Sequence, residues 1–111
     1  RQLALARNAI GELFNEVDLI VLPTAPWLPE TIAEAENPDE ATGAEPSTRN
    51  VFAFNVFGIP AITVPCGFGR DGLPVGLQIC GPALGELDVL ALAHAYEQAT
   101  DWHRRQPPLE A

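Results

Sequence analysis

Apolar residues recur every three or four positions in three stretches of the chain, and this spacing places them on one face of a helix. The pattern predicts helices over about residues 2–16, 49–57 and 86–100. The apolar face of the first helix consists of Leu3, Ala6, Ile10, Leu13, Phe14 and Val17. The helix at 49–57 is apolar nearly all round, so we expect it to be buried on most sides or to line a pocket.

Two later stretches have the patterns of β-strands. Residues 61–64 form a short apolar run, and residues 75–80 alternate apolar side chains with polar or small ones. Asp71-Gly72 between them suits a two-residue turn, whose central positions both need positive φ. The sequence therefore predicts a β-hairpin at about residues 61–80.

An earlier apolar run, residues 19–22, ends at Pro23 and has the pattern of a strand buried on both faces. The order of helix, strand, crossover and second strand predicts an α/β layer structure. A parallel pairing of this first strand with residues 61–64 would be right-handed, with the helix at 49–57 in the crossover. Gly58 suits the left-handed position that ends this helix.

Residues 24–47 form a long acidic loop that several prolines interrupt. Residues 31–36 fit one or two helical turns within it. Loops of this length are either functional lids or irregular, solvated segments, and the sequence leaves both alternatives open.

The composition narrows the classes of function for this chain of 111 residues, which forms at most one domain. A net charge of −9 argues against binding of nucleic acid, because phosphates require a basic surface. No apolar run is long enough to cross a membrane and no signal peptide is visible, so we expect a cytoplasmic protein. Neither histidine has a second ligand at useful spacing, and we expect no metal and no other cofactor.

The two cysteines, Cys66 and Cys80, lie on the two predicted hairpin strands. With the turn centred as above, Cys66 faces Leu77 and Cys80 faces Thr63, on opposite sides of the sheet. This register excludes a disulfide, although a one-residue bulge would reopen the question.

Several motifs, taken in order, resemble the C-terminal part of the amidase signature family. They are Asp18-Leu19-Ile20-Val21-Leu22-Pro23-Thr24, Gly58-Ile59-Pro60-Ala61-Ile62, Val64-Pro65-Cys66-Gly67-Phe68 and Asp71-Gly72-Leu73-Pro74-Val75-Gly76-Leu77-Gln78. The resemblance implies the C-terminal part of a mixed-sheet α/β/α sandwich, as a fragment of a single amidase domain. The absence of methionine and the uncapped start at Arg1-Gln2 also indicate a fragment.

The resemblance implies an enzyme that cleaves the C–N bond of a carboxamide. The family uses a serine nucleophile, a second serine beside a cis peptide bond, and a lysine base. This chain contains no lysine and one serine, Ser47, so the catalytic residues are expected in an N-terminal remainder of the enzyme. The expected partners are that remainder and a small amide substrate, and the chain alone is expected to be inactive.

The helix around Phe54 is similar to the family segment that lines the acyl side of the pocket. The candidates for substrate contact are Val51, Phe54, Asn55 and Arg49. A structural role for Asn55, holding the neighbouring turn, stays open. Since the apolar residues sweep most of the helical wheel, Phe54 is predicted to point away from the strands. We expect the resulting apolar patch to cause self-association or to bind the N-terminal remainder.

Two other functions stay open. One is the A subunit of a glutamyl-tRNA amidotransferase, which shares the fold and releases ammonia from glutamine. Against it, the segment before Phe54 lacks the Asp-rich, Tyr-containing run expected there. The other is a non-catalytic binding or structural domain that has lost the chemistry.

Overall fold

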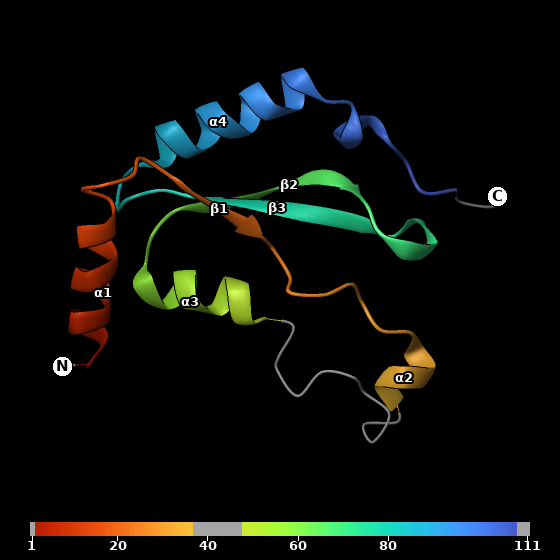
Figure 1. Cartoon of the computed structure of the whole chain (residues 1–111), viewed down its shortest axis with the longest axis horizontal. Helices are drawn as coiled ribbons and strands as arrows, with labels where there is room; N and C mark the ends of the chain where they lie inside the picture. The colour runs from red at the N-terminus through yellow and green to blue at the C-terminus, as the bar shows by residue number, and fades with distance from the viewer. Residues whose placement is uncertain (1, 37–47, 109–111) are drawn as a thin grey trace.

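The computed structural model describes residues 2–36 and 48–108, which form three layers (Figure 1). Helix α4 (Glu86–Ala99) lies along one face of a three-stranded sheet, and helix α3 (Arg49–Phe57) lies on the other side. The strands are β1 (Ile20–Pro23), β2 (Ala61–Phe68) and β3 (Pro74–Cys80). The arrangement confirms the α/β fold class.

Three further elements extend from these layers. Helix α1 (Gln2–Leu13) packs against α3 and is shorter than the predicted helix, because a turn begins after Leu13. Helix α2 (Ile32–Glu36) supplies the helical turns expected within the acidic loop. Residues 37–47 of that loop, Ser47 among them, lie outside the described residues. A 3-10 turn, Trp102–Arg104, follows α4 and packs on β2.

The sheet has the order β1-β3-β2, and both pairs of neighbouring strands are antiparallel. A direct parallel pairing of β1 with β2, for which the sequence analysis considered the handedness, does not occur, because β3 lies between them and pairs with both. The prediction that β1 is buried on both faces is wrong. Val21 is 49% exposed, since α4 lies over β2 and β3 and leaves this edge strand uncovered. An apolar run looks the same in the sequence whether one face or both are covered.

The predicted hairpin is confirmed, as β2 pairs with β3, although residues 69–73 separate the strands where a two-residue turn was predicted. Asp71 and Gly72 both adopt positive φ, 61° and 71°. The Leu73 N–H donates to the Arg70 carbonyl at 3.3 Å and closes the turn. This is the backbone geometry that the Asp-Gly pair predicts.

The strand register corrects the predicted geometry of the cysteines. β2 bulges at Cys66, and Cys80 lies opposite Ala61 instead of Thr63. The bulge and a connection longer than two residues together shift the pairing. Both cysteines are free thiols, with Cys80 buried and Cys66 half-buried.

The apolar core lies between α4 and the sheet. Val64 and Ile79 on the strands pack against Val89 and Ala93 on the helix, and all four are buried. Side chains alternate along a strand, so Ile79 faces this core whereas its neighbour Gln78 faces α3. Full burial of an aliphatic side chain of this size contributes about 1.5–3 kcal/mol, which makes this face the main source of stability.

Helix α3 has the predicted bounds and the predicted end. Gly58 adopts φ 70° and ψ 37°, and its N–H donates to the Phe54 carbonyl at 3.0 Å. At the start of the helix, the Thr48 side chain makes no capping hydrogen bond. The Thr48 carbonyl accepts instead from the N–H groups of Val51 and Phe52.

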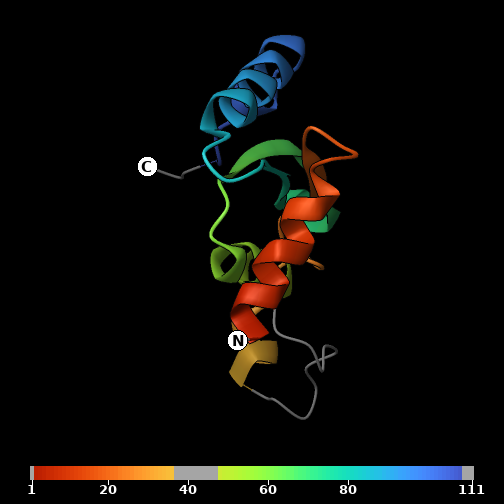
Figure 2. The ribbon, with the colours of Figure 1, turned by 90° about the vertical axis from the view of Figure 1, so that its left-hand side faces the viewer.

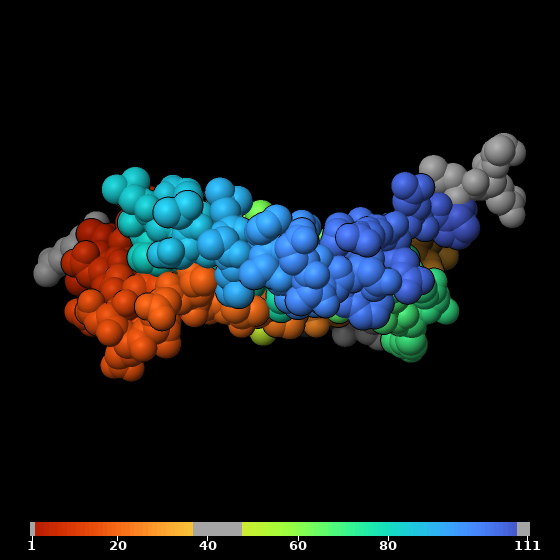
Figure 3. All heavy atoms as spheres, turned by 90° about the horizontal axis from the view of Figure 1, so that it is seen from above, coloured from red at the N-terminus to blue at the C-terminus, as the bar shows by residue number. Residues whose placement is uncertain are grey.

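The molecule is open rather than spherical. Its radius of gyration is 16.6 Å, against about 13 Å for a compact chain of this length. The side view shows α4, the sheet and α3 stacked with little lateral extent (Figure 2). From above, α4 lies along the top of the molecule (Figure 3). Leu87 and Leu90 on this helix are exposed. Within residues 2–36 and 48–108, no helix has the length and apolar character that a membrane span requires.

Candidate functional site

The sheet face opposite the core carries a group of polar and small residues, which we call the polar face. Thr63 on β2 lies directly opposite Gln78 on β3, and Gly76 lies on the same side of β3. Thr24, just after β1, and Asn50, in the first turn of α3, complete the group. Four segments that are distant in the sequence therefore meet on the α3 side of the sheet.

Two threonine hydroxyls meet over a glycine on this face. Thr24 Oγ1 and Thr63 Oγ1 are 3.1 Å apart, and the Thr24 N–H donates to the Gly76 carbonyl at 2.9 Å. A Cβ on residue 76 would lie 2.7 Å from Thr63 Cγ2 and 2.8 Å from Thr24 Oγ1. Only glycine leaves room for the two threonine side chains at this position. Thr63 is exposed and Thr24 is half-buried, so a ligand can reach the hydroxyls.

Gln78 and Asn50 connect the sheet to α3 through side-chain hydrogen bonds. Gln78 Nε2 donates to the Asn50 carbonyl at 3.1 Å, and Asn50 Nδ2 donates to the Pro23 carbonyl at 2.8 Å. Gln78 is only 3% exposed, and a buried amide is costly unless it is hydrogen-bonded. These bonds hold the first turn of α3 against the ends of β1 and β3.

The four residues predicted to contact substrate do not converge on one side of α3. At about 100° per residue, Val51 and Asn55 share a flank, whereas Arg49 points about 140° away from Phe54. Arg49 and Asn55 are exposed, and Val51 is half-buried. The structure therefore groups Val51 with Asn55 and separates both from Arg49.

Phe54 lies on the inner side of α3, so the prediction that it points away from the strands is wrong. It is 9% exposed, and its ring stands edge-to-face with that of Phe57 at 6.1 Å. Phe52, which is 65% exposed, takes the outward position. Asn50, one turn before Phe54, bonds to the β1 end and so decides which side faces inward. The exposed apolar part of α3 contains Phe52, and substrate contact by Phe54 stays a prediction.

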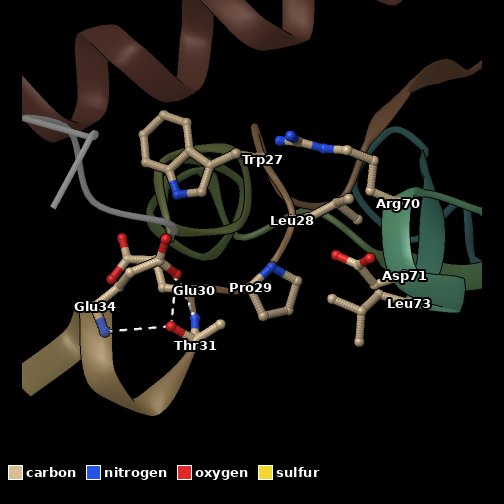
Figure 4. A pocket seen from close by; sticks show the side chains of 9 residues that line it. All are labelled: Trp27, Leu28, Pro29, Glu30, Thr31, Glu34, Arg70, Asp71 and Leu73. Carbon is tan, nitrogen blue, oxygen red and sulfur yellow. Dashed lines mark hydrogen bonds between the residues drawn. The ribbon is translucent and has the colours of Figure 1, made fainter.

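A separate cavity of about 390 Å³ lies between the segment that leads into α2 and the tip of the hairpin (Figure 4). Its lining residues are Trp27, Leu28, Pro29, Glu30, Thr31, Glu34, Arg70, Asp71 and Leu73. The Thr31 N–H donates to Glu34 Oε2 at 2.8 Å, and the Glu34 N–H donates to Thr31 Oγ1 at 3.3 Å. The bond from the Thr31 backbone, followed by that from its hydroxyl, lowers the pKa of Glu34. This carboxylate therefore caps α2. None of the four residues predicted to contact substrate lines the cavity.

The remaining reactive group near the polar face is the Cys80 thiol. Burial raises the pKa of Cys80 to about 11, so the thiol stays neutral and weakly nucleophilic at neutral pH. Among the residues that the structure describes, no three His, Cys, Asp or Glu side chains are placed to hold a metal ion. The accessible chemistry of the polar face is therefore hydrogen bonding by the two threonine hydroxyls.

Sequence reasoning missed Thr24, Thr63 and Asn50 as members of one site. The available signal was a hydroxyl within an apolar strand and another directly after the strand-ending Pro23. Such positions indicate a sheet face that is not packed into an apolar core. Nothing in the spacing shows that the two hydroxyls meet, because β3 brings β1 and β2 together.

Comparisons with known proteins place the chain in a family. The sequence model of the amidase family matches residues 1–90. The A subunit of glutamyl-tRNA(Gln) amidotransferase from Synechococcus sp. (strain JA-2-3B'a(2-13)) is 48% identical over 105 residues, which cover 95% of this chain and 20% of that protein. The chain thus spans about a fifth of the length of the curated relatives it matches.

Solved structures agree with the sequence match. The A subunit of glutamyl-tRNA(Gln) amidotransferase from Thermotoga maritima has a TM-score of 0.69 at 30% identity, covering 85% of this chain and 20% of that one. The 6-aminohexanoate cyclic dimer hydrolase has a TM-score of 0.73 at 29% identity, covering 96% of this chain and 24% of that one. The match over residues 1–90 and the shared fold lead to one conclusion: the chain belongs to the amidase family.

Proposed function

We propose that this chain forms one wall of the substrate pocket in an enzyme that cleaves the C–N bond of a carboxamide. The observation that carries the proposal is the pair of accessible hydroxyls, Thr24 and Thr63, 3.1 Å apart. When one hydroxyl donates to the other, the pair keeps one free O–H and several lone pairs. These groups match the carbonyl oxygen and the N–H of an amide.

The neighbouring helix suits the acyl part of such a substrate. Among the residues of α3, only Phe54 is buried, so most of the helix surface is open to another group. The flank with Val51 and Asn55 offers an apolar and a polar side chain next to each other. We therefore assign the acyl side to this flank and the amide side to the hydroxyl pair.

The nucleophile and the base are proposed to come from the rest of the enzyme. A serine acts as a nucleophile when an adjacent base accepts its proton, and this sequence contains no lysine. The role of the chain is then to orient the amide for attack, which lowers the entropic part of the barrier. Ammonia or an amine leaves as the acyl group passes to the serine, and water then hydrolyses the resulting ester to release the carboxylic acid.

A second candidate is the A subunit of a glutamyl-tRNA amidotransferase, with glutamine as the amide. The observation that favours it is the 48% identity over 105 residues to a protein of that name. Both candidates share amide cleavage and differ in the acyl group. A substrate panel that contains glutamine and simple aliphatic and aromatic carboxamides separates them.

The test uses the complete enzyme that contains this chain, with Thr63→Val as the variant. Valine keeps the shape of threonine but removes the hydroxyl, so KM should rise about 3- to 10-fold, the range of one hydrogen bond. Thr100→Val, which changes a threonine beyond the end of α4, is the matched control. Ammonia release over the panel measures both.

Two results would contradict the proposal. One is a complete enzyme that releases neither ammonia nor an amine from any member of the panel. The other is turnover by the isolated chain that Ser47→Ala abolishes, because the nucleophile would then lie within these residues. Such a result would place the chemistry on the segment outside the described residues.

A further inference from the structure

Gln78 is the single polar side chain that is buried among the described residues, and it bonds to a helix instead of to a strand. Burial of a glutamine amide costs free energy unless the amide is hydrogen-bonded, so the hydrogen bond that Gln78 makes offsets the cost of its burial. Its donor reaches the Asn50 carbonyl, which belongs to the first turn of α3. A carbonyl has two lone pairs, so the Asn50 carbonyl can take this bond and its helical one.

Asn50 passes the connection on to β1. Its side-chain amide donates to the Pro23 carbonyl at 2.8 Å. Pro23 directly precedes Thr24 in the sequence. The Gln78–Asn50–Pro23 hydrogen-bond chain therefore joins β3, the start of α3 and the end of β1. The residue after Pro23 carries one of the two hydroxyls of the polar face.

The other end of α3 is held by a different contact. Arg7 Nε on α1 donates to the Val56 carbonyl at 3.2 Å, in the last turn of the helix. Helix α3 is thus held at two points, with the flank of Val51 and Asn55 between them. A change at the first point would tilt this flank relative to the hydroxyl pair.

We propose that Gln78 and Asn50 are positioning residues that set the distance between the acyl side and the amide side of the pocket. The inference rests on the proposed function, because it takes the α3 flank and the hydroxyl pair as the two sides of one pocket. Neither residue needs to touch the substrate. Gln78 and Asn50 influence which acyl groups the α3 flank accommodates while the hydroxyl pair binds the amide.

The first arm of the experiment does not depend on activity. Hydrogen exchange is measured for the Val51 and Phe52 amides, which donate to the Thr48 carbonyl in the first turn of α3. Gln78→Leu removes the donor at similar volume, and exchange of these amides should rise about tenfold while core amides on β3 stay protected. Gln98→Leu makes the same chemical change at an exposed position of α4 and should leave exchange unaltered.

The second arm compares KM and kcat of the complete enzyme over amides with acyl groups of increasing size. Gln78→Leu should raise KM for the larger acyl groups about tenfold and change kcat for the smallest amide less than about threefold. Asn50→Asp keeps the backbone carbonyl that accepts from Gln78, but its carboxylate cannot donate to the Pro23 carbonyl and repels it, so this variant should give the same profile. Asn50→Asp also replaces Gln78→Leu in both arms of the experiment if Gln78→Leu does not fold. Combining the two changes should add little, because both break one hydrogen-bond chain.

The outcomes separate the inference from the proposed function. Unaltered exchange in both variants, or a uniform change of KM across all acyl groups, overturns the positioning role. A wild-type enzyme without amide cleavage overturns the proposed function and the selectivity that rests on it. Raised exchange together with a shift in acyl preference supports both.

Discussion

The two faces of the sheet differ although the same strands supply both. Ile79 and Val64 face α4 and form a dry apolar core with Val89 and Ala93. On the other side, Gln78 and the Pro23 carbonyl meet Asn50 of α3 through hydrogen bonds, and Thr63 remains exposed.

Within this one small sheet, the α4 face stabilises the fold and the α3 face carries the candidate site. Apolar burial is non-directional and tolerates small shifts, so the α4 face can hold the layers together by area alone. Hydrogen bonds are directional, so the polar face holds α3 in one orientation. Its open hydroxyls remain available to another group.

Ile79→Ala is the change expected to lower the free energy of unfolding most strongly. Ile79 is 0% exposed, and loss of its side chain should lower the free energy of unfolding by about 2–5 kcal/mol. Val21→Ala, directly opposite Ile79 on β1 and largely exposed, should cost less than about 1 kcal/mol. Denaturant unfolding measures both, and equal losses would mean that α4 does not cover β3 in solution.

Gly76→Ala tests the close approach on the polar face. The added Cβ would meet the Thr63 methyl and the Thr24 hydroxyl, and overpacking of this kind costs about 1–3 kcal/mol. Thr63→Ser removes the methyl and keeps the hydroxyl, so it should restore part of the stability in the Gly76→Ala background. If the serine change has the same effect in both backgrounds, the clash lies elsewhere.

Gly72→Val acts on the turn that joins β2 to β3 and therefore on both faces together. A β-branched residue resists φ of 71°, so the free energy of unfolding should fall by more than about 1 kcal/mol. Gly11→Ala in α1 has no atoms within 4 Å of the new Cβ and should raise stability by about 0.5–1 kcal/mol. An unchanged melting temperature for Gly72→Val would place the turn at other residues.

The last expected effect is a pH dependence that Cys80 contributes, and it appears only in alkaline solution. Its pKa is raised from 9.0 to about 11 by burial, so the folded state retains a proton that the unfolded chain loses first. This contribution is complete below pH 9 and is lost as the pH rises from about 9 to 11. Unfolding followed across this range should show the loss in the wild type and not in Cys80→Ala. A variant with the same loss would assign it to another group.

Local patterns predicted the elements of this fold well. The helix at 49–57 and its end at Gly58 follow from an apolar stretch and a left-handed glycine, and both depend on neighbouring residues only. The Asp71-Gly72 turn is equally local. Where the sequence analysis was wrong, the property depended on a distant segment. β1 reads as fully buried, and its exposed edge follows from where α4 lies.

The helices and the hairpin could be predicted from the sequence alone. The resemblance to amidases and the absence of a lysine base in these residues could also be read from it. Only the tertiary structure decided that β3 stands between β1 and β2, that Phe54 faces inward, and that the hydroxyls of Thr24 and Thr63 meet. The two sets of properties differ in the sequence separation of the residues on which they depend. Turn and helix preferences arise within a few residues, whereas the strand order and the inner side of α3 depend on contacts such as that between Gln78 and Asn50.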